Sequence, residues 1–153
     1  MQNWIDQLLS SKPNRENANT EIGSLMDRNK KYDKGFEKEI SPKSLAYIGD
    51  AVYELYIRVK VFQERKGKTK KMHKASVAQV KADAQAKMLK KIEPYLNEEE
   101  RKIVRRGRNT KGGRPPRKIE YMVYKCSTAF ETLIGYLYLK GRTDRIIDLL
   151  ERR

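Results

Sequence analysis

The chain has 153 residues, one cysteine and a formal net charge of +15. This length fits one domain with a single core. A lone cysteine excludes an internal disulfide and suits a reducing cytoplasm. No apolar run reaches the roughly 18 residues that a transmembrane helix needs. The positive charge indicates a polyanionic partner, and nucleic acid is favoured over an anionic membrane surface. The less favoured alternative is a basic protein that has no polyanionic partner.

Residues 1–39 are interpreted as an N-terminal extension, because Asn, Lys, Glu and Asp dominate there and apolar residues are sparse. Such a composition favours a flexible tail over a folded element. Residues 40–153 are the predicted folded domain. Its first helix is predicted to begin at Ser41-Pro42, since Ser is a favoured N-cap and Pro a favoured first helical residue, and to end near Gly67. Apolar residues recur along it at spacings of three and four.

A second helix is predicted from about Lys71 to Lys91. A short third helix follows from Asn97, a predicted N-cap, to about Arg106. Residues 105–118 are predicted to form a basic loop, because the three Gly and two Pro in this segment disfavour a regular element.

An apolar helix is predicted from about Glu120 to Lys140, with Gly141 just beyond its end. Thr143 is expected to cap a last helix that runs to the C-terminus. No segment shows the alternation of a strand. The sequence therefore predicts an all-α fold in a single domain.

Two carboxylates lie in apolar helical segments. Asp50 is part of the first predicted helix, and Glu131 is the only acid between Tyr121 and Lys140. A carboxylate among apolar residues costs several kcal/mol unless it is paired or bound to a cation. Two carboxylates on two packed helices can form a hard oxygen site for Mg²⁺. The alternative is an ion pair, for example between Arg58 and either Asp50 or Glu54.

Two glycines accompany these acids. Gly49 and Gly135 both lie in the middle of predicted helices, where Gly costs about 1 kcal/mol relative to Ala. A close approach of the two helices near the acids would explain both glycines.

Three segments resemble a known family. Residues 45–54, Leu-Ala-Tyr-Ile-Gly-Asp-Ala-Val-Tyr-Glu, resemble the signature helix of the ribonuclease III catalytic domain. Residues 128–135, Thr-Ala-Phe-Glu-Thr-Leu-Ile-Gly, resemble the second catalytic helix of that family. The segment between them, Arg-Arg-Gly-Arg-Asn-Thr-Lys-Gly-Gly, resembles the loop found in the subfamily called Mini-ribonuclease III. The resemblance covers about residues 41–150.

The resemblance implies the all-α endonuclease fold of ribonuclease III, with the catalytic domain only and no double-stranded-RNA-binding domain. It implies a homodimer that cuts both strands of double-stranded RNA and leaves 5′-phosphate and 3′-hydroxyl ends. The implied cofactor is Mg²⁺, with Mn²⁺ as a substitute. The implied substrate is the large-subunit (23S) ribosomal RNA precursor, with a ribosomal protein or a pre-ribosomal particle as a further partner, in the cytoplasm.

Carried over residue by residue, the resemblance makes Asp50 and Glu131 the catalytic and metal-binding residues. The family signature has a Glu where this chain has Ala46 and an Asp where it has Thr128, so two of four acids are missing. This loss supports an alternative in which the chain is a non-catalytic RNA-binding or ribosome-associated protein that kept the fold. The secondary site candidates are Glu54, Thr128 and His73.

A chain without an accessory binding domain must hold RNA with its own surface. Lysine and arginine suit this role, because double-stranded RNA is recognised mostly through its shape, phosphates and 2′-hydroxyls. The alternative for the basic loop is a solvated insert. The predicted RNA-binding residues are Arg105, Arg106, Arg108, Lys111, Arg114, Arg117, Lys118, Lys74 and Lys81.

Overall fold

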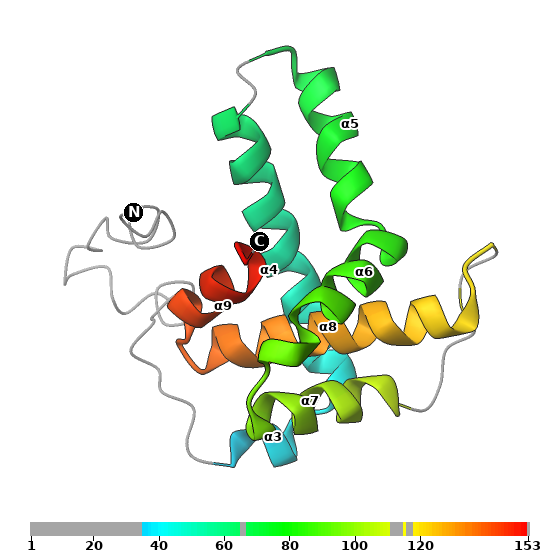
Figure 1. Ribbon diagram of the computed structural model, residues 1–153, viewed down its shortest axis with the longest axis vertical. Coiled ribbons are helices and arrows are strands. Elements are labelled where there is room, and N and C mark those ends of the chain that lie inside the picture. Colours follow the sequence, from blue (N-terminus) through cyan, green and yellow to red (C-terminus); the bar gives the residue numbers. More distant parts are fainter. Residues whose placement is uncertain (1–34, 65–66, 111–114, 116–117, 153) are drawn as a thin grey trace, which may run out of the picture.

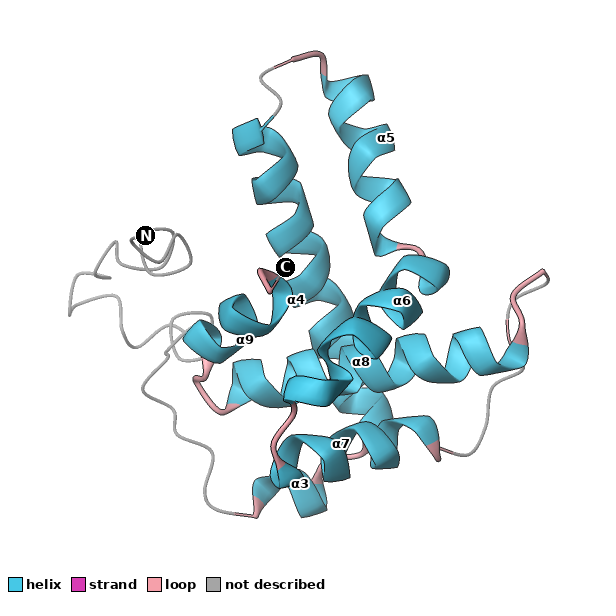
Figure 2. Ribbon diagram, in the orientation of Figure 1, coloured by secondary structure: helices cyan, strands magenta, loops and turns pink. Residues whose placement is uncertain are grey.

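The structure is a computed structural model that describes residues 35–64, 67–110, 115 and 118–152. Most of the predicted extension, residues 1–34, lies outside the described residues. Within the described ranges every regular element is a helix and no strand is present, which confirms the all-α fold class (Figures 1 and 2). None of the helices in this part of the chain is long and apolar enough to span a membrane.

The described helices, in chain order, are α3 (Phe36–Glu39), α4 (Pro42–Glu64), α5 (Thr69–Val80), α6 (Ala82–Ile92), the short 3-10 helix η2 (Glu93–Tyr95), α7 (Glu98–Arg108), α8 (Tyr121–Leu139) and α9 (Thr143–Leu150). Helix α8 lies in the centre, where α4 crosses it and α6, α7 and α9 surround it (Figure 1). Helix α5 packs beside the second half of α4, and the two project from the rest of the molecule.

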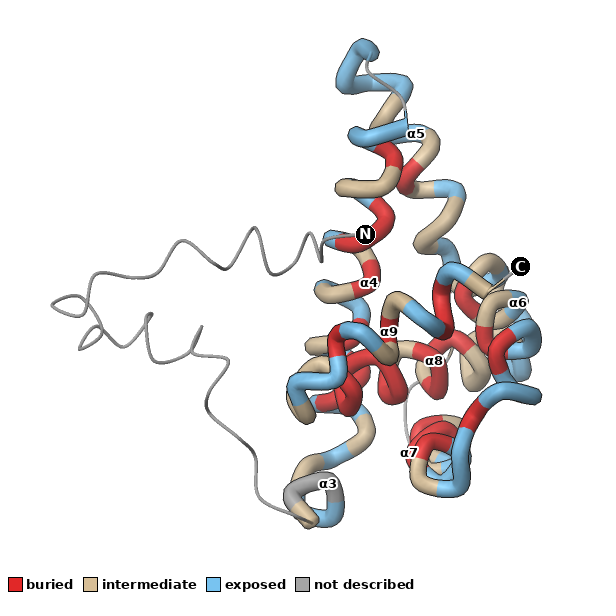
Figure 3. Tube along the Cα trace, turned by 60° about the vertical axis from the view of Figure 1, so that its left-hand side comes forward, coloured by how far each residue is buried: buried red, intermediate tan, exposed pale blue. Residues whose placement is uncertain are grey.

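Helix α4 begins where the sequence predicts. The Ser41 hydroxyl accepts a hydrogen bond from the Ser44 backbone N–H at 3.1 Å, as an N-cap does. The apolar face of α4 is buried, but its opposite face is exposed, as Figure 3 shows along the helix. Asp50 lies on this exposed side, so the residue that the sequence places in an apolar helical segment is in fact partly open to solvent.

The prediction of one helix from Lys71 to Lys91 is wrong. The chain breaks at Lys81, whose backbone is extended, with φ −62° and ψ 151°. The break has a tertiary cause: α5 stays beside α4, whereas α6 turns to pack against α8 and buries Gln85, Leu89 and Ile92. Neither a Gly nor a Pro marks this position in the sequence.

Helix α7 starts at the predicted cap and continues beyond its predicted end. Asn97 and Glu100 form a capping box, in which each side chain accepts a hydrogen bond from the backbone of the other at 2.9 Å. The helix reaches Arg108, so the start of the predicted loop is in fact helical. Gly107 is buried there, and a Cβ on it would lie only 2.8 Å from the Ala129 Cα. This glycine permits close packing of α7 on α8 and does not break the helix.

The end of α8 confirms the prediction for Gly141, which adopts a left-handed conformation with φ +70°. The Arg142 N–H donates to the Leu137 carbonyl at 2.9 Å, which completes the turn. The prediction for Thr143 is wrong: Arg142 occupies the N-cap position of α9, and Thr143 is the first residue of the helix.

A buried ion pair joins α7 to α9. The Glu100 side chain is fully buried, and Arg145 donates to its two carboxylate oxygens at 2.9 and 3.0 Å. Burial alone would raise the pKa of Glu100, but hydrogen bonds from Arg145 and from the Asn97 backbone outweigh it and lower that pKa. The charge pair and the capping box therefore share one carboxylate.

Candidate active site

Two glycines set the spacing of the helices that carry the acids. A Cβ on Gly49 would lie 1.8 Å from the Glu131 carbonyl oxygen, and a Cβ on Gly135 would lie 2.0 Å from the Leu45 carbonyl oxygen. Side chains at these positions would collide with the facing backbone. The expected close approach of α4 and α8 is confirmed.

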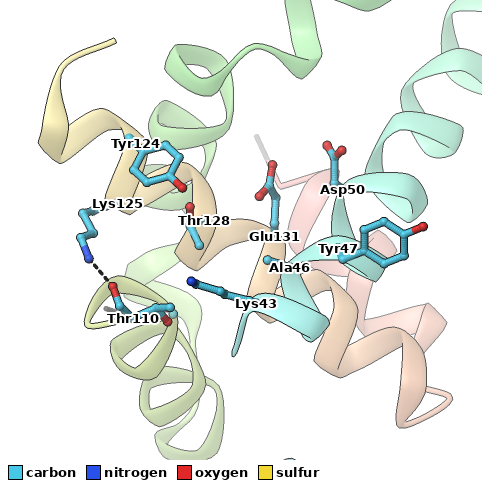
Figure 4. A pocket seen from close by; sticks show the side chains of 10 residues that line it. Lys43, Ala46, Tyr47, Asp50, Thr110, Tyr124, Lys125, Thr128 and Glu131 are labelled. Atoms are coloured by element: carbon cyan, nitrogen blue, oxygen red, sulfur yellow. Dashed lines mark hydrogen bonds between the residues drawn. The ribbon is translucent and has the colours of Figure 1, made fainter. Parts of the chain in front are cut away.

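A cavity of about 380 Å³ opens beside this contact. Helices α4 and α8 each contribute residues at spacings of three, four and seven, which places them on one face of each helix. Residues at the end of α7 line another side of the cavity. The lining residues are Lys43, Ala46, Tyr47, Asp50, Gly107, Thr110, Tyr124, Lys125, Thr128 and Glu131 (Figure 4).

Asp50 and Glu131, predicted on separate helices, are brought together in this cavity (Figure 4). Although Asp50 is exposed as a residue, partial burial of its carboxyl group in the cavity and the neighbouring charge of Glu54 raise its pKa. Burial and the charge of Asp50 raise the pKa of Glu131 to about 7. The carboxyl groups also interact directly, which lowers the pKa of Asp50 and raises that of Glu131. When the pair shares one proton, Glu131 therefore holds it.

Gln85 on α6 is a site residue that the sequence did not predict. Its side chain is buried, with an exposed fraction of 1 %, and its amide lowers the pKa of both Asp50 and Glu131. A glutamine on the otherwise apolar face of α6 is the signal that could have identified it, since a buried amide needs a polar neighbour.

The acid pair fits a divalent metal ion by the chemistry of its donors. Two like-charged carboxylates repel each other, and a bound cation would relieve that repulsion. Within the described residues no group of three or more His, Cys, Asp and Glu side chains could hold a metal ion, so Asp50 and Glu131 are the acidic ligands that this part of the chain offers. Mg²⁺ is commonly held by one or two carboxylates and keeps several waters, which suits such a site.

The secondary candidates lie in different places. Thr128 lines the cavity, whereas Glu54 forms an ion pair with Arg58 at 2.6 Å and is not among the lining residues. For Glu54, then, the alternative of an ion pair with arginine is the one observed. His73 is exposed on α5 and does not line the cavity.

The predicted RNA-binding residues are partly described. Arg105, Lys74, Lys81 and Lys118 are exposed. Arg106 and Arg108 are half-buried on α7, where Arg106 donates to the Ile40 carbonyl at 3.2 Å and Arg108 to Glu93 at 3.3 Å. Lys111, Arg114 and Arg117 lie outside the described residues. The described residues of this set are therefore spread over α5, its junction with α6, α7 and the segment before α8.

Comparison with known proteins places these features in a family. Residues 43–142 match the Ribonuclease III domain family. The chain belongs to that family. The match spans both acid-bearing helices and the basic segment between them.

Relatives narrow the placement to Mini-ribonuclease III. The chain is 48% identical over 112 residues to a Mini-ribonuclease 3 of Thermoanaerobacter sp. (strain X514), covering 73% of this chain and 79% of the relative. It is also 48% identical to the Mini-ribonuclease 3 of Kosmotoga olearia, over 75% of this chain and 78% of the relative. This member of the ribonuclease III family is thus an endoribonuclease of the Mini-ribonuclease III group.

A solved structure supports the fold assignment. The crystal structure of protein FN1578 from Fusobacterium nucleatum superposes with a TM-score of 0.68 at 34% identity. The similarity covers 74% of this chain and 90% of that one.

Proposed function

We propose that the chain is a Mg²⁺-dependent endoribonuclease that cleaves double-stranded RNA, with Asp50 and Glu131 as its catalytic and metal-binding residues. The observation that carries the proposal is the meeting of these two carboxyl groups, from α4 and α8, in one cavity. Membership of a family that acts on double-stranded RNA supports the substrate class. The net charge of +15 supports a polyanionic substrate.

The two carboxyl groups have different roles in this mechanism. In this proposal Asp50 is an oxygen ligand, and its interaction with the Glu131 carboxyl group favours its ionised form although burial opposes it. The pKa of Glu131 is about 7 when no metal is bound, so in this proposal Glu131 becomes the second oxygen ligand once a bound cation has displaced its proton. When held by these two residues, Mg²⁺ would supply an activated water and charge neutralisation at the phosphodiester. Hydrolysis that leaves a 5′-phosphate and a 3′-hydroxyl end is the proposed outcome.

We further propose that two copies of the chain act together. Helix α4 exposes three large apolar side chains on one face, with exposed fractions of 80 % for Tyr47, 45 % for Leu55 and 64 % for Phe62. An exposed apolar stripe of this kind is typical of a surface that meets a partner. A homodimer would bring two cavities together, one for each strand of a duplex.

The biological substrate proposed from the family resemblance is the 23S ribosomal RNA precursor, processed in the cytoplasm. A ribosomal protein or a pre-ribosomal particle is proposed as a further partner. To test this assignment, the rate of cleavage of a precursor transcript at one duplex is compared with the rate for a random-sequence duplex of equal length. Equal cleavage of both RNAs would count against it.

The site is tested by substitution of each acid with its amide. Asp50→Asn and Glu131→Gln should each lower the rate of cleavage of a long RNA duplex in Mg²⁺ by at least about 100-fold, as expected when a group acting in the transition state is lost. Asp83→Asn, at an exposed position on α6, is the matched control and should cleave like the wild type. Cleavage by Asp50→Asn at the control rate would refute the site assignment. Binding of the duplex by the wild type without cleavage in Mg²⁺ or Mn²⁺ would favour the non-catalytic alternative.

A further inference from the structure

Two lysine side chains line the same cavity as the acid pair, and the proposed metal chemistry does not use them. Lys43 comes from the first turn of α4, and Lys125 from the first half of α8. In Figure 4 both side chains lie on the side of the cavity where Thr110 lies, and the carboxyl groups of Asp50 and Glu131 lie on the other. The cavity therefore has a cationic side as well as an acidic one.

Within the described part of the chain, nothing neutralises the ammonium group of Lys43. The side chain is exposed, and no hydrogen bond or ion pair joins it to another described residue. The first turn of α4 contains no acidic residue that could pair with it. An uncompensated ammonium group on a cavity wall attracts anions from solution.

Lys125 is held in place by neutral groups. Its Nζ donates a hydrogen bond to the Thr110 backbone carbonyl and lies 5.4 Å from the centroid of the Tyr121 ring. An ammonium group has three donors, so two remain available for another acceptor. The side chain is half-buried, which fixes its charge on the cavity wall.

Both lysines lie one helical turn from a position that lacks a family acid. Lys43 precedes Ala46 by three residues and Lys125 precedes Thr128 by three, and residues three apart are neighbours on a helix surface. All four residues line the cavity. The side of the cavity that has lost carboxylates is therefore the side that carries ammonium groups, and those groups offset the two carboxylates that remain.

We propose that Lys43 and Lys125 form a binding subsite for a phosphodiester group of the RNA backbone, next to the Asp50 and Glu131 pair. The subsite rests on the proposed function and specifies how that function binds its substrate. Lysine binds phosphate as a compact point charge with several donors, which matches a non-bridging phosphate oxygen. In this arrangement the two ammonium groups supply charge neutralisation that a four-carboxylate site would obtain from additional metal ions.

The experiment measures binding separately from cleavage. The affinity of a short RNA duplex is measured in EDTA over a range of salt concentrations for the wild type, Lys43→Gln, Lys43→Arg and Lys125→Gln. Lys43→Gln should weaken binding about tenfold, the loss of one charge-assisted hydrogen bond, and reduce the slope of log affinity against log salt by about one. Lys43→Arg should restore most of the affinity. Lys90→Gln, at an exposed position on α6 outside the cavity lining, is the control.

Lys125→Gln also removes the hydrogen bond to the Thr110 carbonyl, so the melting temperature of this variant is measured as well. If Lys125→Gln does not fold, the variants at the exposed Lys43 decide the question. Affinity and salt slope of Lys43→Gln equal to those of Lys90→Gln would overturn the subsite. Cleavage by the wild type in Mg²⁺ is recorded as a separate arm. A wild type that fails to cleave refutes the proposed function, whereas a wild type that cleaves beside Lys43→Gln with unchanged binding refutes the subsite alone.

Discussion

Glu131 carries a carboxyl group whose negative charge is opposed by burial and by Asp50, and this has a cost for folding. Below pH 4.5, the ordinary pKa of the group, it is protonated in both the folded and the unfolded chain. Between pH 4.5 and about 7 the unfolded chain loses the proton and the folded chain keeps it. The folded state then binds more protons, so the free energy of unfolding falls as the pH rises through this range.

Glu131→Gln should therefore stabilise the protein at alkaline pH when no divalent metal is present. In EDTA at pH 8, the free energy of unfolding of the variant should exceed that of the wild type by up to about 3 kcal/mol, and the gain should vanish near pH 4.5. Urea denaturation across this pH range measures the effect, with Glu98→Gln, at an exposed position, as the control. Parallel pH profiles for the wild type and Glu131→Gln would contradict the prediction.

At the scale of single residues, the sequence identified the acids but not their neighbours. Asp50 and Glu131 stand out because a carboxylate in an apolar helix needs a partner. Gln85 and Lys43 do not stand out, because an amide on α6 and a lysine in a basic chain are ordinary until the fold places them beside the acids. These residues come together only because α4, α6 and α8 pack against one another.

At the scale of helices, the crossing of α4 and α8 depends on backbone contact, and this gives a stability prediction. Gly49→Ala should lower the free energy of unfolding by about 3 kcal/mol or more, because its Cβ would lie 1.8 Å from the Glu131 carbonyl oxygen and the helices would have to separate. Chemical denaturation followed by circular dichroism measures this loss.

Gly141→Ala is the matched control for that substitution. Nothing lies within 4 Å of a Cβ at Gly141, so only its left-handed backbone opposes the change, at a cost of about 1 kcal/mol. Equal losses for the two substitutions would show that close packing is not what Gly49 provides.

Helix boundaries were predictable where the cause is local and not where it is tertiary. Ser41 and Asn97 cap their helices through hydrogen bonds to nearby backbone, and both starts were predicted. The break at Lys81 was not, because it follows from α5 and α6 packing against different helices. Gly107 suggested a loop, yet it lies inside α7 because contact with α8 requires a residue without a side chain.

For the whole molecule, the exposed stripe on α4 leads to a prediction about assembly. Phe62→Glu and Leu55→Glu should each convert a proposed homodimer into a monomer, because a charge would be buried in an apolar contact. Light scattering after gel filtration measures the mass. Tyr95→Glu, at a large exposed residue of η2 away from the stripe, should leave the mass unchanged. A wild type that is monomeric at micromolar concentration would contradict the proposed dimer.

The contact between α4 and α8 also bears on how this pocket tolerates change. Gly49 and Gly135 pack against carbonyl groups of the facing helix, so the separation of Asp50 and Glu131 is set by contact between the two backbones. Side chains elsewhere on the cavity wall take no part in that contact between the two backbones. Different residues at positions 46 and 128 could thus leave the acid pair aligned. An engineer could vary those same two positions to alter metal or substrate preference, provided that both glycines are left untouched.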